Sequence, residues 1–323
     1  MLQPSELKAA LEGHLLCISD QAGWMHPLYA PITYILALGG KRIRPMLLML
    51  SYQAMSGKPG TEALNSATAV EFFHNFSLIH DDIMDKAPVR RGQPSVHERW
   101  NMNTAILSGD AMFALAYEFL IKDFPTHAAP LLRQFTQVAV GLCEGQMEDL
   151  EMAGQPATVP QYIEMIRKKT AMLIGGSLAL GAIAANAPES EVQTLYRLGE
   201  TAGIGFQLHD DYLDVYAPAD KFGKQVGGDI VENKMTFLLI RCYEKANPAQ
   251  RQHLERLLFQ EHDNEAKVAG VMALYEELGI RQETIAEMDR YFQTADEMAK
   301  AFRKHPGFAL IEGFLQSIAK RDH

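Results

Sequence analysis

Apolar residues recur at helical spacing through nearly the whole 323-residue chain, and this pattern restricts the possible folds more than any other feature. Proline and glycine separate the apolar stretches, as at Lys58-Pro59-Gly60 and Asn247-Pro248. Alternating patterns typical of strands are nearly absent. The predicted helices cover residues 31–38, 45–56, 63–86, 104–122, 130–152, 160–186, 190–216, 232–246, 249–260, 264–278, 280–303 and 306–320. The sequence therefore predicts an all-α protein with its helices packed as a bundle.

No linker is long or polar enough to mark a domain boundary, so residues 1–323 are predicted to form one domain. The net charge of -10 argues against a general nucleic-acid binder, which needs a basic surface. The longest weakly polar stretch, residues 173–187, is too short to span a bilayer. Residues 1–16 lack the apolar core of a signal peptide.

The three cysteines, Cys17, Cys143 and Cys242, are widely spaced and include no Cys-x-x-Cys pair. They are predicted to be buried thiols in a reducing compartment. We therefore expect a cytoplasmic protein without a membrane span.

Two Asp-Asp-x-x-Asp sets, about 130 residues apart, lie in otherwise apolar predicted helices. Their members are Asp81, Asp82, Asp85, Asp210, Asp211 and Asp214. In each set, aspartates three or four positions apart share one face of the helix. Massed carboxylates repel one another unless cations neutralise them. Hard divalent ions with oxygen ligands fit this role, and magnesium usually completes its shell with water and phosphate oxygens. The sequence predicts a metal-dependent diphosphate enzyme.

Arginines follow the first aspartate set, at Arg90 and Arg91. Arginine binds phosphate oxygens with paired hydrogen bonds, so metal-bound carboxylates and these arginines could clamp a diphosphate. The alternative is a solvent-exposed helix end with two surface arginines. His74 lies two turns before Asp81, on the same side of the predicted helix.

A second basic element is Gly39-Gly40-Lys41-Arg42-Ile43-Arg44-Pro45. Pro45 suits the first position of a helix. Lys41, Arg42 and Arg44 would place three cations at that helix start. The helix dipole disfavours cations there unless an anion binds, so this segment is predicted to bind one.

The second aspartate helix also carries Gln207, which extends the aspartates into one polar stripe. The loop over residues 217–229 contains glycines together with Lys221 and Lys224, and it is predicted to form a lid over phosphate. Such loops are common, so alone this one is weak evidence. Lys234 is expected at the start of the next helix.

Taken in order, these motifs and Lys169-Thr170 resemble those of the trans-isoprenyl diphosphate synthases, or polyprenyl synthetases, over about residues 30–240. The resemblance is to short-chain members that make farnesyl or geranylgeranyl diphosphate. It implies an isoprenoid synthase-type helical bundle around a deep central cavity, usually as a homodimer. It also implies head-to-tail condensation of isopentenyl diphosphate with an allylic diphosphate (dimethylallyl, geranyl or farnesyl), assisted by Mg²⁺ and releasing diphosphate.

The resemblance also implies a role for each matching residue. Three magnesium ions would be bound directly by Asp81, Asp85 and Asp210, with direct or water-mediated help from Asp82, Asp211 and Asp214. The allylic diphosphate would contact Lys169, Lys224 and Arg90. Isopentenyl diphosphate would be held by Gly40, Lys41, Arg44, His74 and Arg91. Thr170 and Gln207 would face the developing allylic cation, and Lys234 would lie near the second metal cluster.

Product length is a separate prediction. A growing chain would pass along the first aspartate helix, where Phe76 lies about 7.5 Å before Asp81 at 1.5 Å per residue. In the family a bulky aromatic there is associated with short products, and the neighbouring Ser77 is small. This favours a product of fifteen to twenty carbons. The alternative is that Phe76 is core packing and the floor lies elsewhere, at Met112 or Phe113.

Two other activities are compatible with parts of the pattern. A class I terpene cyclase shares the fold and the first aspartate motif, but it normally carries an Asn/Asp-Ser/Thr-Glu motif as the second. It would also lack the second diphosphate site of Lys41 and Arg44. A longer-chain polyprenyl diphosphate synthase is the other alternative. The chain departs from the family's Lys-x-Thr-x-Pro pattern at Leu238, which replaces the proline.

Overall fold

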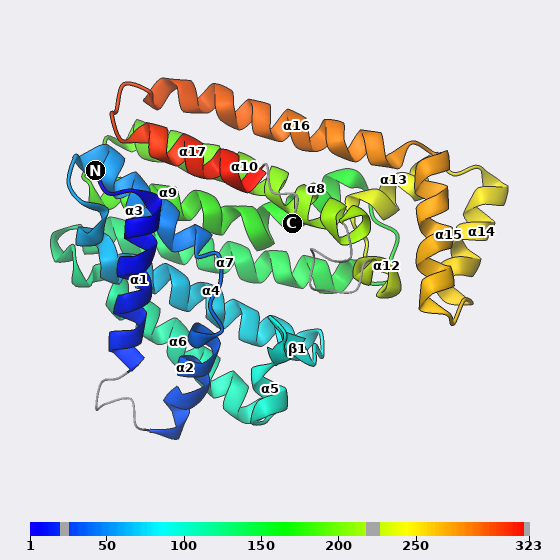
Figure 1. Cartoon of the computed structure of the whole chain (residues 1–323), viewed down its shortest axis with the longest axis horizontal. Helices are drawn as coiled ribbons and strands as arrows, with labels where there is room; N and C mark the ends of the chain where they lie inside the picture. The colour runs from blue at the N-terminus through cyan, green and yellow to red at the C-terminus, as the bar shows by residue number, and fades with distance from the viewer. Residues whose placement is uncertain (20–25, 218–226, 320–323) are drawn as a thin grey trace. The chain divides into compact units, whose positions relative to one another are not determined.

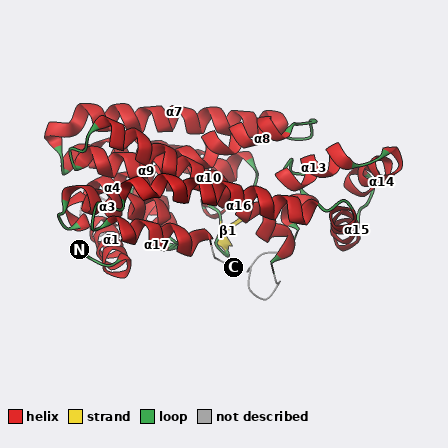
Figure 2. Cartoon of the chain, turned by 90° about the horizontal axis from the view of Figure 1, so that it is seen from above, coloured by secondary structure: helices red, strands yellow, loops and turns green. Residues whose placement is uncertain are grey.

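The computed structural model describes residues 1–19, 26–217 and 227–319, and almost all of their regular structure is helical (Figure 1, Figure 2). The strands among these residues are β1 (Val89–Arg90) and β2 (Gln93–Pro94), which pair as one antiparallel hairpin. The prediction of an all-α protein is confirmed.

The chain divides into two compact units. Unit 1 comprises Met1–Thr136, Gly176–Tyr196 and Phe302–Ile311, and unit 2 comprises Gln137–Gly175, Arg197–Ala301 and Glu312–His323. The single domain over residues 1–323 stays a prediction, because it concerns how the two units combine.

Unit 1 is built around α4. Its complete helices are α1 (Pro4–Ser19), α2 (Ala30–Ala37), α3 (Ile43–Ser56), α4 (Leu64–Met84), α5 (Val96–Arg99) and α6 (Met102–Lys122). It also includes parts of α7 (Ala128–Met152), α9 (Met172–Ala184), α10 (Glu189–Tyr216) and α17 (Phe308–Ala319). Helix α4 lies along α6 and also packs against α3 (Figure 1). Because α3 is apolar on nearly every side, it is almost completely buried.

Helix α1 was not predicted, since the first predicted helix began at residue 31. The helix buries one stripe of apolar side chains, Leu7, Leu11, Leu15 and Ile18, and packs against α3 and α4. This spacing is the signal that could have revealed the helix.

Unit 2 contains α8 (Val159–Ile166), α12 (Gly228–Val231), α13 (Phe237–Lys245), α14 (Pro248–Phe259), α15 (Asn264–Glu277) and α16 (Ile280–Ala299). A π-helical turn, η5 (Arg167–Ala171), joins α8 to the start of α9. The predicted helix over residues 160–186 is therefore not uniform. One buried core lies around Tyr162, Ile204 and Phe237, and a second around Leu238, Val271 and Tyr275.

Among the described residues, α6 is the one helix long and apolar enough to cross a membrane. Core helices of soluble proteins can meet the same test, and α6 buries Ala105, Met112, Ala116 and Leu120 in unit 1.

The cysteine prediction was partly wrong. Cys242 is buried, but Cys17 and Cys143 are exposed. Cys17 on α1 and Cys143 on α7 both lie outside the apolar stripe of their helix.

Candidate active site

Both aspartate sets lie at the C-terminal ends of long helices. The first occupies the last turn of α4, with Asp85 as the C-cap residue. The second occupies the last two turns of α10, which ends at Tyr216. The negative end of a helix dipole disfavours carboxylates, and the carboxylates also repel one another. Each set therefore needs cations close by.

The three aspartates of the first set differ in environment. Asp82 has no exposed surface, and both its oxygens accept hydrogen bonds from Arg90 Nε, at 2.9 and 3.2 Å. Burial raises the pKa of Asp82, although Arg90 acts in the opposite direction. The Asp81 side chain is partly exposed and Asp85 is exposed. The backbone N–H of Asp85 donates to the carbonyl of Asp81, so the two residues lie one helical turn apart.

A tight hairpin positions the two arginines that follow α4. Arg90 on β1 pairs with Gln93 on β2, which leaves Arg91 and Gly92 as a two-residue turn. Both turn residues have positive φ, 52° and 74°, as a type I′ turn requires. Arg90 is thereby directed to Asp82, whereas Arg91 Nη1 donates to the carbonyl of Gly39. This hairpin was not predicted from the sequence.

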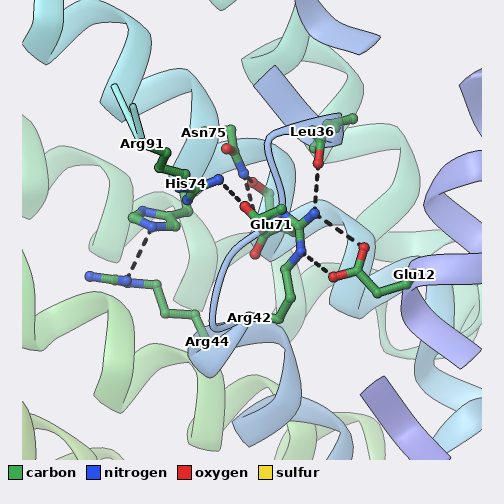
Figure 3. A network of polar contacts seen from close by, with 9 residues as sticks. Glu12, Leu36, Arg42, Arg44, Glu71, His74, Asn75 and Arg91 are labelled. Atoms are coloured by element: carbon green, nitrogen blue, oxygen red, sulfur yellow. Dashed lines mark hydrogen bonds and ion pairs between the residues drawn. The ribbon is translucent and has the colours of Figure 1, made fainter. Parts of the chain in front are cut away.

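The basic segment before α3 does not present its three cations together. Lys41 is exposed, but Arg42 is buried and binds the carboxylates of Glu12 and Glu71 (Figure 3). Arg42 is therefore not part of an anion-binding group, and that expectation was wrong. Helix α3 also begins at Ile43, so Pro45 is its third residue and not its first.

Arg44 and His74 are in direct contact. Arg44 Nη1 lies 3.2 Å from His74 Nε2. Because arginine has no acceptor, Nε2 must accept, which places the histidine proton on Nδ1. Burial, and then the charge of Arg44, lower the pKa of His74 well below its ordinary value. The structure thus brings Arg44 to His74, and Arg91 to the Gly39–Gly40 backbone, in unit 1. A Cβ atom on Gly40 would lie 3.1 Å from the Arg91 guanidinium, and the φ of 148° at this position favours glycine.

The two predicted product-length residues lie on α4. Phe76 is 8% exposed, and its ring stacks on Phe113 of α6, with centroids 4.9 Å apart and planes 10° apart. Ser77 is half-buried, and its hydroxyl donates to the carbonyl of His74.

In unit 2, the π-turn η5 carries Lys169 and Thr170. Lys169 Nζ lies 2.6 Å from Asp149 Oδ2. The Thr170 hydroxyl donates to Gln207 Oε1, at 3.0 Å. A Cβ atom on Gly145 of α7 would lie 2.4 Å from the backbone nitrogen of Lys169, so the glycine allows α7 to approach this turn closely. Single π-turns within α-helices are frequent at functional sites.

The predicted polar stripe of α10 exists, but its members have different partners. Asp211 is buried and accepts hydrogen bonds from Gln207 Nε2 and from the Tyr162 hydroxyl. Burial, and next the charge of Asp229, raise the pKa of Asp211 to about 8. Asp214 accepts from the backbone N–H of Asp229, at 2.9 Å, whereas Asp210 is half-buried.

Of the predicted lysines near the second set, only Lys234 is described. Lys234 lies between α12 and α13, with Nζ 3.7 Å from Asp229 Oδ1. The expectation that it begins a helix was wrong, because Thr236 caps α13. Lys224 and Lys221 lie outside the described residues.

Sequence reasoning missed the residues that hold the predicted ones in place. These are Glu12, Glu71, Asp149, Tyr162 and Asp229. Only Asp229 carried a signal, because it lies in the glycine-rich loop. The others are far from their partners in sequence, and only the packing of the helices brings them together.

A family model described as polyprenyl synthetase matches residues 25–275. The chain belongs to the polyprenyl synthetase family. This polyprenyl synthetase is 35% identical over 292 residues to a short chain isoprenyl diphosphate synthase of Methanothermobacter thermautotrophicus, covering 90% of this chain and 89% of the relative. It is 40% identical over 221 residues to a geranylgeranyl pyrophosphate synthase of Geoglobus acetivorans, covering 68% and 69% of the two chains.

A solved structure of a geranylgeranyl pyrophosphate synthase superposes on this polyprenyl synthetase with a TM-score of 0.92 and 36% identity, covering 99% of each chain. The fold is therefore the all-α fold of polyprenyl synthases, as predicted. The predictions of the family and of a trans-prenyltransferase enzyme are confirmed as well.

The donor set of this polyprenyl synthetase fits magnesium. Among the described residues, no three acidic, histidine or cysteine side chains are arranged to hold a metal ion by themselves. Magnesium commonly takes only one or two carboxylates and completes its shell with water and phosphate oxygens. Asp81 and Asp85, one turn apart with accessible side chains, suit such binding. Asp82 and Asp211 are buried and already hydrogen-bonded, so they fit a supporting role better.

Proposed function

We propose that this polyprenyl synthetase condenses isopentenyl diphosphate head to tail with an allylic diphosphate and releases inorganic diphosphate. The observation that carries the proposal is that both Asp-Asp-x-x-Asp sets are complete, each at the C-terminal end of a long helix. The second set distinguishes a synthase from a class I terpene cyclase, which normally has a different motif there. The similarity of the chain to a short chain isoprenyl diphosphate synthase and to geranylgeranyl diphosphate synthases also supports the proposal.

We propose that both aspartate sets act on one allylic diphosphate through magnesium, with three ions per active site. Asp81 and Asp85 are proposed as direct ligands from the first set and Asp210 from the second, and none of these three is buried as Asp82 and Asp211 are. Asp214 is proposed to assist. When bound, the magnesium ions would neutralise the charge of the departing diphosphate.

The basic residues of the chain have two proposed tasks. Lys169, Arg90 and Lys224 would bind the allylic diphosphate and stabilise the charge that develops on it as the carbon–oxygen bond breaks. Gly40, Lys41, Arg44, His74 and Arg91 would hold isopentenyl diphosphate. The contact between Arg44 and His74 supports the second group, because it gives the guanidinium a fixed position. Lys234 is proposed to lie beside the second metal cluster.

Thr170 and Gln207 are proposed to face the allylic cation. The Thr170 hydroxyl donates to the Gln207 amide oxygen, so the orientation of both dipoles is fixed. Oxygen dipoles stabilise the cation, and exclusion of water prevents its capture. After isopentenyl diphosphate adds to the cation, the released diphosphate is the proposed acceptor of the final proton. No side-chain base is then needed.

We propose a product of fifteen to twenty carbons. The stacked rings of Phe76 and Phe113 support it, because they place bulk one and a half turns before Asp81 along α4. Relatives differ in product length, since they include geranylgeranyl, geranylfarnesyl and heptaprenyl diphosphate synthases.

A homodimer in the cytoplasm is also proposed. Helix α6 exposes three large apolar side chains, Met102, Ile106 and Leu107, on neighbouring turns. Burial against a second copy would remove them from water. Light scattering coupled to gel filtration would test this, with Leu107→Glu as a variant expected to weaken the dimer.

Product analysis tests the proposed function. The protein is incubated with magnesium, isopentenyl diphosphate and each allylic primer, and the products are sized by chromatography. A fifteen- or twenty-carbon diphosphate is expected only when both substrates are present. A cyclic hydrocarbon made from the allylic diphosphate alone would instead identify a cyclase.

A further inference from the structure

Arg42 is the one cation of the Lys41–Arg44 segment that the proposed function does not use. Its side chain is 1% exposed and lies among acidic and carbonyl oxygens (Figure 3). Nε and Nη2 bind the two carboxylate oxygens of Glu12, at 2.9 and 3.2 Å. Nη1 lies 2.6 Å from Glu71 Oε1, and Nη2 also donates to the carbonyl of Leu36, at 2.7 Å. The guanidinium thus joins α1, the end of α2 and α4.

The backbone of Arg42 has an unfavourable conformation. Its φ is 51° and ψ is 34°, in the left-handed region, which is unfavourable for a residue with a side chain. Gly39 and Gly40 just before it also have positive φ, 72° and 148°. The chain therefore makes a sharp left-handed turn before α3 begins. Such a conformation persists only where surrounding contacts hold it, and the hydrogen bonds of the guanidinium provide these contacts.

Arg42 and Arg44 bind the same helix, one turn apart. Arg42 binds Glu71, and Arg44 binds His74, three residues further along α4. Asn75 holds the Glu71 side chain in place, since its Nδ2 donates to both the backbone carbonyl and Oε1 of Glu71. The turn before α3 is therefore held in a fixed position relative to His74, the residue of α4 that is proposed to hold isopentenyl diphosphate.

We propose that Arg42 is a positioning residue: bound by Glu12 and Glu71, it fixes the left-handed turn that sets Lys41 and Arg44 for isopentenyl diphosphate. This inference rests on the proposed function. It assigns Arg42 to the binding of one substrate, although its side chain touches neither substrate.

Steady-state kinetics of Arg42→Lys and Glu71→Gln test the inference. Lysine keeps the charge but cannot reproduce the forked set of hydrogen bonds. The KM for isopentenyl diphosphate should rise about tenfold to hundredfold, as expected when a binding group is displaced. The KM for the allylic diphosphate should stay within about twofold. The double variant should be no worse than the poorer single one, because both changes break one connection.

Binding measured without turnover provides a second readout. Isopentenyl diphosphate alone is titrated calorimetrically onto the full-length wild type and the variants, and the variants should bind it correspondingly more weakly. Glu12→Gln is the milder variant, because its side chain is 36% exposed and Glu71 still holds Arg42. If Arg42→Lys and Glu71→Gln do not fold, Glu12→Gln tests the inference: a rise of its KM for isopentenyl diphosphate supports the role of Arg42, and an unchanged KM overturns it.

Asp123→Asn is the matched control. Asp123 also joins two helices of unit 1, since it accepts hydrogen bonds from the backbone and side-chain N–H groups of Asn65 at the start of α4. Its loss should lower stability without changing the KM for isopentenyl diphosphate. The inference is overturned if both KM values rise together, if neither rises, or if the control behaves like Arg42→Lys. A wild type that forms no prenyl product would instead disprove the proposed function.

Discussion

The carboxylate of Asp82 is fully buried and accepts hydrogen bonds from Nε and Nη2 of Arg90, on the hairpin that follows α4. Asp81 beside it keeps a partly exposed side chain. We predict that Asp82→Asn lowers the free energy of unfolding by about 2–3 kcal/mol, because it leaves Arg90 without its buried counter-ion. Asp81→Asn should change it by less than about 1 kcal/mol, yet should abolish most activity. Urea denaturation and turnover, measured on both variants, check the contrast. Equal stability losses would contradict it.

A second prediction concerns the two aspartate sets. Asp81→Ala and Asp210→Ala should each lower turnover by at least about a hundredfold while the protein stays folded. If both residues serve one diphosphate, the double variant should be scarcely slower than either single variant, because groups that act as a unit are not additive. Circular dichroism confirms folding, and Asp289→Ala, an exposed change on α16, is the control. Full activity in either single variant would disprove the metal assignment.

Product length gives a third prediction. Phe76→Ala should lengthen the product by one or more isoprene units, because it removes the ring stacked on Phe113. Phe113 remains as bulk, so Phe76→Ala combined with Phe113→Ala should lengthen it further. Products are sized by reversed-phase chromatography. Phe72→Leu, which changes a buried α4 ring in contact with Phe119, should leave the product unchanged. If Phe76→Ala has no effect, Phe76 is only core packing.

The fourth prediction concerns pH. Burial, and then Arg44, lower the pKa of His74 well below 6.5. The unfolded chain therefore binds a proton at His74 below about pH 6.5 that the folded chain does not, so the contribution of His74 to stability falls as the pH falls through this range. This contribution should approach about 1.4 kcal/mol per pH unit, and it is obtained as the difference between the wild type and His74→Gln, because the raised pKa of Asp211 acts with the opposite sign in both proteins. Urea denaturation at about pH 7.5 and 5.5 measures it. His74→Gln should remove the His74 contribution from the pH dependence of the free energy of unfolding. His253→Gln, which changes an exposed histidine, should leave this pH dependence as in the wild type.

The helical pattern of the sequence predicted most helices to within a few residues. Residues 104–122 and 264–278 correspond closely to α6 and α15, whose first turns are capped by the side chains of Asn101 and Asp263. The shared face of the aspartates could also be predicted, since it depends only on the helical repeat.

The roles of neighbouring basic residues could not be predicted. Arg42 and Arg44 have the same chemistry and are two positions apart, yet one is buried against Glu71 and the other contacts His74. That difference arises from the left-handed backbone conformation of residue 42, which an arginine at this position does not predict. Similarly, the partnership of Tyr162 with Asp211 spans 49 residues and depends on how helices of unit 2 pack.

The π-turn over Arg167–Ala171 has a consequence for how the protein can change. In an ordinary α-helix, adjacent residues do not face the same neighbour, yet here Lys168 reaches Glu148 and Lys169 reaches Asp149, both on α7. A π-turn takes up one residue more than an α-helical turn, so deleting one residue here would restore regular winding and leave the phase of the following helix nearly unchanged. The extra residue therefore serves the contacts of the two adjacent lysines with α7, and deleting it should break one of these contacts without unwinding the helix.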